Sequence, residues 1–160
     1  MIVKEIRDED FTSYKKPSMV IGFPSCTFKC ERDCGQKLCQ NSALAQAPNI
    51  EISVENIVQR YLNNPITKSI IMAGLEPFDS LPSLYHLITE FRKHTNDDIV
   101  IYTGYTKTEL WEYPSTLTYL QKFPNIIIKF GRFVPNETPH YDEILGVKLA
   151  SDNQYAEVIS

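Results

Sequence analysis

Every cysteine of the chain lies in one segment near the N-terminus, CTFKCERDCGQKLC, which runs from Cys26 to Cys39. The four thiols are spaced C-x3-C-x3-C-x4-C along a single loop. A structural zinc site normally takes its ligands as two separated pairs, and the histidines that could complete such a site, His86, His94 and His140, lie far downstream. The spacing therefore favours one iron–sulfur cluster wrapped by this loop over zinc.

Composition restricts the class of protein that carries this loop. A chain of 160 residues, 42% hydrophobic and 22% charged, fits one globular domain spanning residues 1–160. Its net charge of -4 and its scattered lysines and arginines give no attraction to phosphate backbones, so we expect no direct nucleic-acid partner. The sequence has no signal-peptide core and no apolar run long enough to span a bilayer, so we expect a cytoplasmic protein without a membrane partner. Cytoplasmic thiols stay reduced, which disfavours disulfides.

The elements that must position the cysteine loop follow from the hydrophobic pattern. Apolar runs predict strands at 18–23, 68–74, 97–104, 125–131 and 144–151. Helical spacing predicts helices at 53–64, 80–94 and 106–122, the last interrupted at Pro114. Strands that alternate with helices indicate βαβ units and a parallel sheet. The chain is too short for a closed eight-stranded barrel, so we predict an α/β fold: a partial, open (β/α) barrel with a mostly parallel sheet of about five to six strands.

Polar or glycine-containing segments follow each predicted strand. In chain order they read PSCTFKC, AGLEPFD, TGYT, GRFVPNE and SDNQ. In α/β sheets of this kind the ligand sits at the carboxyl ends of the strands. We therefore expect these segments to converge on one rim of the sheet.

These segments together resemble the radical S-adenosylmethionine superfamily, and within it the activating proteins of anaerobic ribonucleotide reductase. That family carries a C-x3-C-x2-C loop after its first strand, then a GGEP-like turn, a TGY, a DG-x-F and an S-x-NQ segment. After the cysteine loop, the counterparts here are Gly74-Leu75-Glu76-Pro77, Thr103-Gly104-Tyr105, Gly131-Arg132-Phe133 and Ser151-Asp152-Asn153-Gln154. The match runs in the right order through nearly the whole chain.

The chain also departs from the family pattern. The cysteine loop is longer, Leu75 replaces the second glycine of GGEP, and Phe130 replaces the aspartate of DG-x-F. Residues 14–17 stand where relatives have an NG-x-G-x-R segment, so whatever that segment does in relatives is not transferred to this chain. These differences affect single contacts rather than the order of the motifs.

The resemblance implies a 4Fe-4S cluster with three cysteine ligands, because one iron must stay open to chelate S-adenosylmethionine. Cys26 and Cys30 fit the first two positions. Spacing slightly prefers Cys34 as the third ligand, but Leu38 before Cys39 and the CQN sequence after Leu38 resemble the ending of the family motif, so we predict Cys39 with Cys34 as the alternative. The motif matches further imply a cofactor-binding set of Gly74, Leu75, Glu76, Thr103, Ser151, Asn153 and Gln154.

The function that the resemblance implies is reductive cleavage of S-adenosylmethionine to a 5'-deoxyadenosyl radical, which generates a glycyl radical on a partner enzyme. The expected partners are the large glycyl-radical subunit of anaerobic ribonucleotide reductase and a one-electron reductant such as flavodoxin or ferredoxin. No catalytic side chain is assigned beyond the cluster. The alternatives are a radical enzyme acting on another peptide or small metabolite, and a non-catalytic zinc or iron–sulfur module. Ferredoxin loops use tighter C-x2-C spacing and usually a proline after the last cysteine, which this loop lacks.

Overall fold

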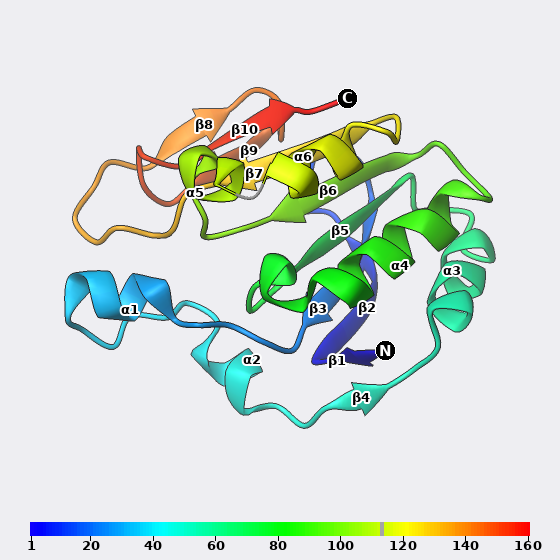
Figure 1. Cartoon of the computed structure of the whole chain (residues 1–160), viewed down its shortest axis with the longest axis horizontal. Coiled ribbons are helices and arrows are strands. Elements are labelled where there is room, and N and C mark those ends of the chain that lie inside the picture. The colour runs from blue at the N-terminus through cyan, green and yellow to red at the C-terminus, as the bar shows by residue number, and fades with distance from the viewer. Residues whose placement is uncertain (113) are drawn as a thin grey trace.

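The chain folds around one six-stranded sheet, seen in a computed structural model that describes residues 1–112 and 114–160. Its strand order is β10, β7, β6, β5, β3, β2. The bounds are β2 (Glu5–Asp10), β3 (Ser18–Phe23), β5 (Ser69–Gly74), β6 (Asp98–Tyr102), β7 (Ile126–Phe130) and β10 (Tyr155–Val158). Within the described residues β10 and β2 form the two edges, so the sheet is open and does not close into a barrel (Figure 1).

The centre of the sheet is parallel and its two outer pairings are antiparallel. β3, β5, β6 and β7 pair with one another in parallel, as the alternation of strands and helices predicts. β2 runs antiparallel to β3, and β10 runs antiparallel to β7. The predicted α/β class is therefore confirmed, but the sheet is mixed rather than mostly parallel.

The strand predicted at 144–151 is wrong as a strand of this sheet. Only Val147–Leu149 is extended there, as β9, and it pairs with β8 (His140–Asp142) in a separate two-stranded hairpin. The hairpin turns at Gly146, whose φ of 73° a glycine adopts without steric cost. The edges of the main sheet are instead β2, with the charged sequence EIRDED, and β10, with YAEV. Neither has the apolar run that marks the central strands.

The predicted helices form, with shifted ends. They are α3 (Val54–Leu62), α4 (Leu81–Arg92), α5 (Lys107–Trp111) and α6 (Pro114–Leu120), with a short 3-10 helix η1 (Pro77–Ser80) before α4. Ser53 caps α3 as its sequence predicts, since its hydroxyl accepts a hydrogen bond of 3.1 Å from the Asn56 amide. The helix predicted at 106–122 is two helices, and the part of that prediction on residue 113 lies outside the described residues.

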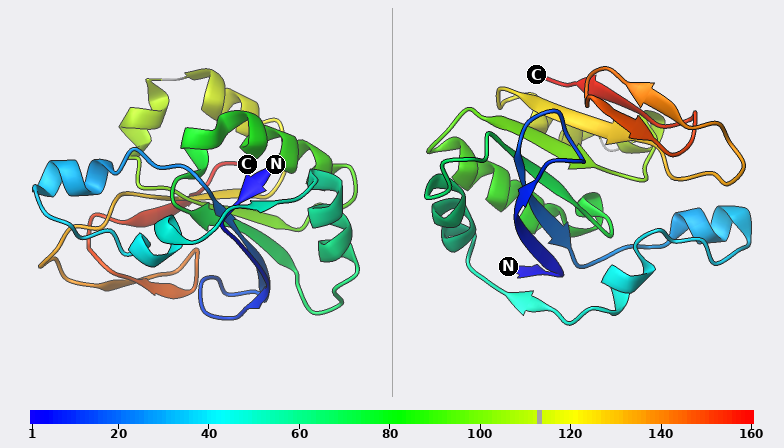
Figure 2. Two further views of the ribbon diagram at one scale, coloured as in Figure 1. Left: turned by 90° about the horizontal axis from the view of Figure 1, so that it is seen from below. Right: turned by 180° about the vertical axis from the view of Figure 1, so that it is seen from behind.

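The two faces of the sheet are covered differently. Alternate strand residues, such as Ile21, Met72 and Phe130, pack under α3, α4, α5 and α6 in the larger core. The residues between them, such as Val20 and Ile71, face a smaller cluster that includes residues of the β8–β9 hairpin. Figure 2 shows the helices on one side of the sheet and this hairpin on the other. The hairpin covers only part of its face, which leaves room for a cavity.

The cysteine segment forms an arm that leaves the sheet after β3 and returns along the outside of the molecule to α3. It contains α1 (Lys29–Cys34), α2 (Ser42–Gln46) and β4 (Ile50–Glu51), and β4 pairs with β1 (Ile2–Val3). In Figures 1 and 2 α1 extends beyond the end of the sheet. Among the described residues, no helix combines the length and the apolar character that crossing a membrane requires.

Candidate functional site

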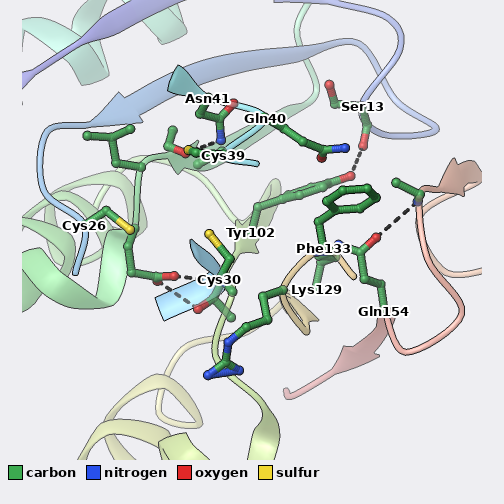
Figure 3. Close-up of a pocket in the computed structure, with 18 of the residues that line it drawn as sticks. Ser13, Cys26, Cys30, Cys39, Gln40, Asn41, Tyr102, Lys129, Phe133 and Gln154 are labelled. Carbon is green, nitrogen blue, oxygen red and sulfur yellow. Dashed lines mark hydrogen bonds between the residues drawn. The ribbon is translucent and has the colours of Figure 1, made fainter. Parts of the chain in front are cut away.

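A cavity of about 460 Å³ lies where the central strands end, on the face that the β8–β9 hairpin covers (Figure 3). Its lining includes most of the cofactor-binding set predicted from the sequence: Gly74, Leu75, Glu76, Thr103 and Gln154. These residues come from the segments after β5, after β6 and before β10. The expected convergence of strand-end segments on one rim is therefore present in the structure.

Ser151 and Asn153, the other two residues of that predicted set, support the cavity wall rather than line it. The fully buried Ser151 hydroxyl accepts a hydrogen bond of 3.3 Å from the Val134 amide. The side-chain amide of Asn153 donates to the Arg132 carbonyl at 2.9 Å. Both contacts hold the segment that follows β7 in place.

Three of the four cysteines line this cavity. Cys26, Cys30 and Cys39 are among its lining residues, whereas Cys34 lies outside it at the end of α1. All four thiols are free and partly exposed. Figure 3 shows the three lining cysteines around one side of the same cavity. Three thiols that face one cavity are a suitable donor set for an iron–sulfur cluster.

Hydrogen bonds hold both ends of the cysteine segment, the start to η1 and the end to the last residue of β5. At its start the Thr27 amide donates to the Asp79 carboxylate at 2.8 Å. At its end the Cys39 amide donates to the Glu31 carboxylate at 3.1 Å, and the Asn41 side chain donates to the Gly74 carbonyl at 2.7 Å. These contacts return Cys39 to the cavity, although thirteen positions separate it from Cys26.

The cavity environment disfavours free thiolates at two of these cysteines. Burial raises the pKa of the Cys26 thiol to about 11, and the nearby carboxylates of Glu76 and Asp79 raise it further. Burial also raises the pKa of Cys30, with a further contribution from Cys39. Because the thiolate is the form that ligates metal, binding of a cluster by these cysteines releases their protons.

The turn after β5 packs directly against the end of β3. Gly74 has a φ of 95°, and a Cβ placed on it would lie 2.6 Å from the Phe23 backbone nitrogen, so only glycine fits. The next residue, Leu75, donates its amide to the Phe23 carbonyl at 3.2 Å. The Leu75 side chain, which stands where the family motif has a second glycine, is compatible with this turn.

Glu76 is a buried carboxylate whose oxygens are held by neighbouring donors. It accepts hydrogen bonds from the Thr103 hydroxyl at 2.8 Å, the Gly104 amide at 2.9 Å and the Phe78 amide at 3.1 Å. Burial raises its pKa to about 7, against the lowering effect of these donors. One carboxylate therefore joins the GLEP and TGY segments, which lie at the ends of the neighbouring strands β5 and β6.

Several residues of this site escaped the sequence analysis. Asp79 binds the Tyr105 hydroxyl at 2.6 Å as well as the Thr27 amide, so it links two of the strand-end segments. Arg132 pairs with Glu109 at 2.6 Å and with Asp33 of α1 at 3.0 Å. Asp79 and Arg132 lie inside or beside the recognised motifs. Their partners, however, come from segments far apart in the sequence, so the sequence alone does not identify these contacts.

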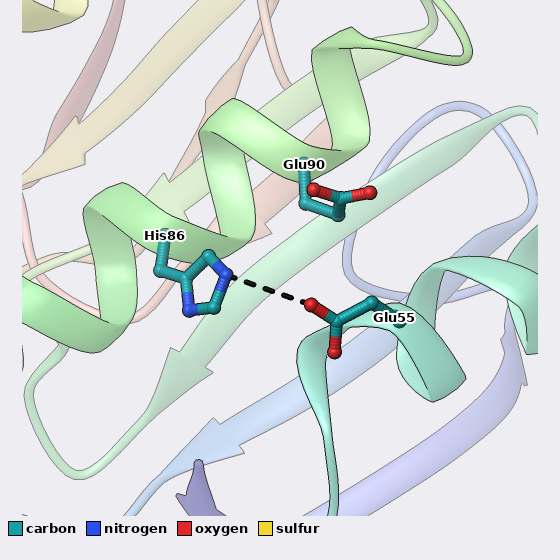
Figure 4. Close-up of side chains that lie close together, drawn as sticks. All are labelled: Glu55, His86 and Glu90. Atoms are coloured by element: carbon teal, nitrogen blue, oxygen red, sulfur yellow. Dashed lines mark ion pairs between the residues drawn. The ribbon is translucent and has the colours of Figure 1, made fainter.

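A second group of metal-binding side chains lies on the opposite side of the helical layer. Ligand atoms of Glu55, His86 and Glu90 come within 4.8 Å of one another (Figure 4). Glu55 and His86 are exposed, and Glu90 already pairs with Lys93 and His94. Such exposed ion pairs contribute little energy, and we assign no site to this group.

Comparison with known proteins assigns the chain to an iron–sulfur family. The model of a 4Fe-4S single cluster domain matches residues 19–154, a range that contains all four cysteines and every strand-end segment around the cavity. No curated protein and no solved structure matches the chain. The prediction of a 4Fe-4S cluster is thereby confirmed in preference to zinc.

Proposed function

The chain belongs to the 4Fe-4S single cluster domain family, and on that basis we propose that it is a radical S-adenosylmethionine enzyme. In this proposal Cys26, Cys30 and Cys39 hold three irons of the cluster. The fourth iron is left to bind the amino and carboxylate groups of S-adenosylmethionine.

The observation that carries the proposal is the division of the cysteines. Three thiols share one cavity with the strand-end residues, and Cys34 lies outside it. A cluster that only transfers electrons normally takes one thiolate for each iron, so all four cysteines would then be expected around one point. A cavity with three thiols supports an iron that is open to a second ligand.

The cavity suits a ligand of the size and polarity of S-adenosylmethionine. Its volume of about 460 Å³ falls in the usual range for small-molecule sites. The Gly74 carbonyl accepts one hydrogen bond from Asn41 and keeps a second lone pair for an N–H of the ligand amino group. Thr103 and Gly104 are less available, because their hydroxyl and amide already donate to Glu76. We therefore assign them to shaping the cavity.

The proposed reaction consumes one electron for each radical formed. An external one-electron donor, such as flavodoxin or ferredoxin, reduces the cluster, and S-adenosylmethionine accepts that electron. Its C5'–S bond breaks to release methionine and the 5'-deoxyadenosyl radical. This radical takes a hydrogen atom from the α-carbon of a glycine, which leaves 5'-deoxyadenosine and a glycyl radical.

We further propose that the glycine belongs to a large partner enzyme, the anaerobic ribonucleotide reductase. This choice of partner is supported by the order of the sequence motifs, which resembles that of the activating proteins of this reductase. The open sheet is compatible with it. In the described part of the chain the sheet ends in two separate edges, β10 and β2, so no barrel wall surrounds the strand ends that a loop of another protein would have to reach.

The proposal is tested by anaerobic reconstitution with iron and sulfide, followed by S-adenosylmethionine and dithionite. We expect 5'-deoxyadenosine to form, and none to form when dithionite is left out. A protein that carries a full cluster but yields no 5'-deoxyadenosine would instead be an electron-transfer module. Efficient turnover of a small metabolite without a protein partner would keep the chemistry and replace the substrate.

A further inference from the structure

Lys129 is a buried lysine in the wall of the cysteine cavity. It lies near the end of β7, where its neighbours Ile128 and Phe130 point into the core beneath the helices. Lys129 therefore points to the opposite face, and only 6% of the residue is exposed. It lines the cavity together with Tyr102, its partner in the β6–β7 pairing (Figure 3).

The ammonium group of Lys129 has more donors than the protein uses. Its Nζ donates to the Gly131 carbonyl at 2.7 Å, and that carbonyl also accepts from the Gln154 side-chain amide at 3.2 Å. A lysine ammonium carries three donors. In the described part of the chain this leaves donors available to a ligand, and Gln154 would still bond to the Gly131 carbonyl if Lys129 turned away.

Among the described cations around the cavity, Lys129 is the one that is both buried and without an ion pair, since Lys148 is exposed to solvent. Lys29 and Arg132 both pair with Glu109, and Arg7 pairs with Asp10. The charge of Glu76 favours the ammonium form of Lys129, but the Glu76 oxygens accept hydrogen bonds from three other donors. Within the described residues no carboxylate forms an ion pair with Lys129. A buried cation without an anionic partner is costly, so an anionic ligand group would be bound favourably here.

We propose that Lys129 binds the carboxylate of the methionine moiety of S-adenosylmethionine. The carboxylate is the one anionic group of that molecule, and an ammonium offers donors only. This inference rests on the proposed function and adds to it a side chain that orients the cofactor. Burial lowers the pKa of Lys129 to about 8, which still leaves most of the population charged at neutral pH.

The test compares two ligands on the reconstituted protein under anaerobic conditions. Dissociation constants are measured by equilibrium dialysis for S-adenosylmethionine and for decarboxylated S-adenosylmethionine, which lacks only the carboxylate. Lys129→Met removes the charge and Lys129→Arg keeps it. Lys68→Met is the matched control, because Lys68 is exposed and does not line the cavity. Iron content and thermal midpoint are recorded for each variant to show that cluster and fold persist.

We expect Lys129→Met to weaken binding of S-adenosylmethionine about tenfold or more while changing binding of the decarboxylated compound little. Lys129→Arg should recover most of the loss, and Lys68→Met should match the unaltered protein. Equal weakening of both ligands by Lys129→Met, or none, would overturn the role of Lys129 and leave the proposed function standing. If the unaltered protein binds neither ligand, the proposed function fails and this inference fails with it.

Discussion

Cys34 and Cys39 are chemically alike and differ in where the fold places their thiols. Cys39 lines the cavity, and its amide is held by Glu31, whereas Cys34 ends α1 outside the cavity. Spacing alone slightly preferred Cys34, and only the sequence around Cys39 argued the other way. Side-chain placement therefore supports the choice that the CQN ending suggested.

We predict that Cys34→Ser keeps the 4Fe-4S cluster and most of the cleavage of S-adenosylmethionine, whereas Cys39→Ser loses both. Serine preserves the size of the side chain but ligates iron far less well than a thiolate. Iron content and 5'-deoxyadenosine yield measure the two effects. The opposite pattern would make Cys34 the third ligand, and loss of the cluster in both variants would mean four ligands and no open iron.

The raised pKa of Glu76 makes the free energy of unfolding depend on pH. Its pKa is about 7 in the folded protein, against 4.5 for an unperturbed carboxyl, because burial disfavours the charged form. Between these values the folded state binds more protons than the unfolded state, so the free energy of unfolding falls as pH rises. The contribution of Glu76 to the free energy of unfolding is fully present below about pH 4.5 and is lost as pH rises through about 7. It is on the order of 3 kcal/mol.

We therefore expect the unaltered protein to be less stable at pH 7.5 than at pH 5, and Glu76→Gln to lose most of that difference. Urea unfolding of both proteins at the two pH values gives the comparison directly. The absolute stability of the variant is not the readout, because the glutamine amide also replaces an acceptor of three hydrogen bonds. Parallel pH profiles for the two proteins would contradict the assignment.

At the scale of elements, the strand-end turns set the positions that the residues occupy. The turn after β5 depends on Gly74, because a Cβ there would meet the backbone of Gly22 and Phe23. Gly35 also has a positive φ, of 64°, but a Cβ there would meet nothing within 4 Å. Substitutions at Gly74 and Gly35 therefore distinguish two free-energy costs: that of a positive φ alone, and that of a positive φ with a clash between the new Cβ and neighbouring backbone.

We predict that Gly74→Ala destabilises the protein by at least about 2 kcal/mol, and that Gly35→Ala costs about 1 kcal/mol. The first value combines strain with a clash between backbones, and the second reflects strain alone. Chemical unfolding of both variants measures the difference. Equal losses would mean that β3 and the β5 turn can separate without cost.

The sequence was most informative for the central strands and least informative for the edges. Ile70, Ile99 and Ile127 belong to apolar runs that are buried on both faces, and such runs mark central parallel strands. β2 and β9 are half-polar edge elements, and their partners are set by contacts that no local pattern records. The same limit applies to the site. The sequence motifs include Gly74 and Glu76. Lys129, by contrast, is only one polar residue in an apolar strand, and the strand register is needed to show which face of the sheet it occupies.

At the scale of the whole molecule, the open sheet and the exposed arm allow a large partner to approach the cavity. The arm with α1 and α2 lies outside the helical layer, and no strand closes the gap between β10 and β2 in the described part of the chain. In the proposed function a protein substrate would contact this side. The molecule would then need its partner in order to use the radical productively.

We predict that the isolated protein cleaves S-adenosylmethionine slowly, and that adding the matching large reductase subunit produces a stable glycyl radical on that subunit. An electron paramagnetic resonance doublet from the partner is the expected signal. The control is a partner whose radical glycine is replaced by alanine. A doublet that survives in this control would place the radical elsewhere and contradict a glycine substrate.

The open iron is the central claim, and electron–nuclear double resonance of the reduced cluster tests it most directly. S-adenosylmethionine labelled with ¹⁵N or ¹⁷O in its methionine moiety is added to the reconstituted protein under anaerobic conditions. If Cys26, Cys30 and Cys39 leave one iron free, the labelled amino nitrogen and carboxylate oxygen should both show strong coupling to the cluster. A reduced 4Fe-4S cluster whose spectrum is unchanged by saturating labelled S-adenosylmethionine would mean that no iron is open, and would contradict the account.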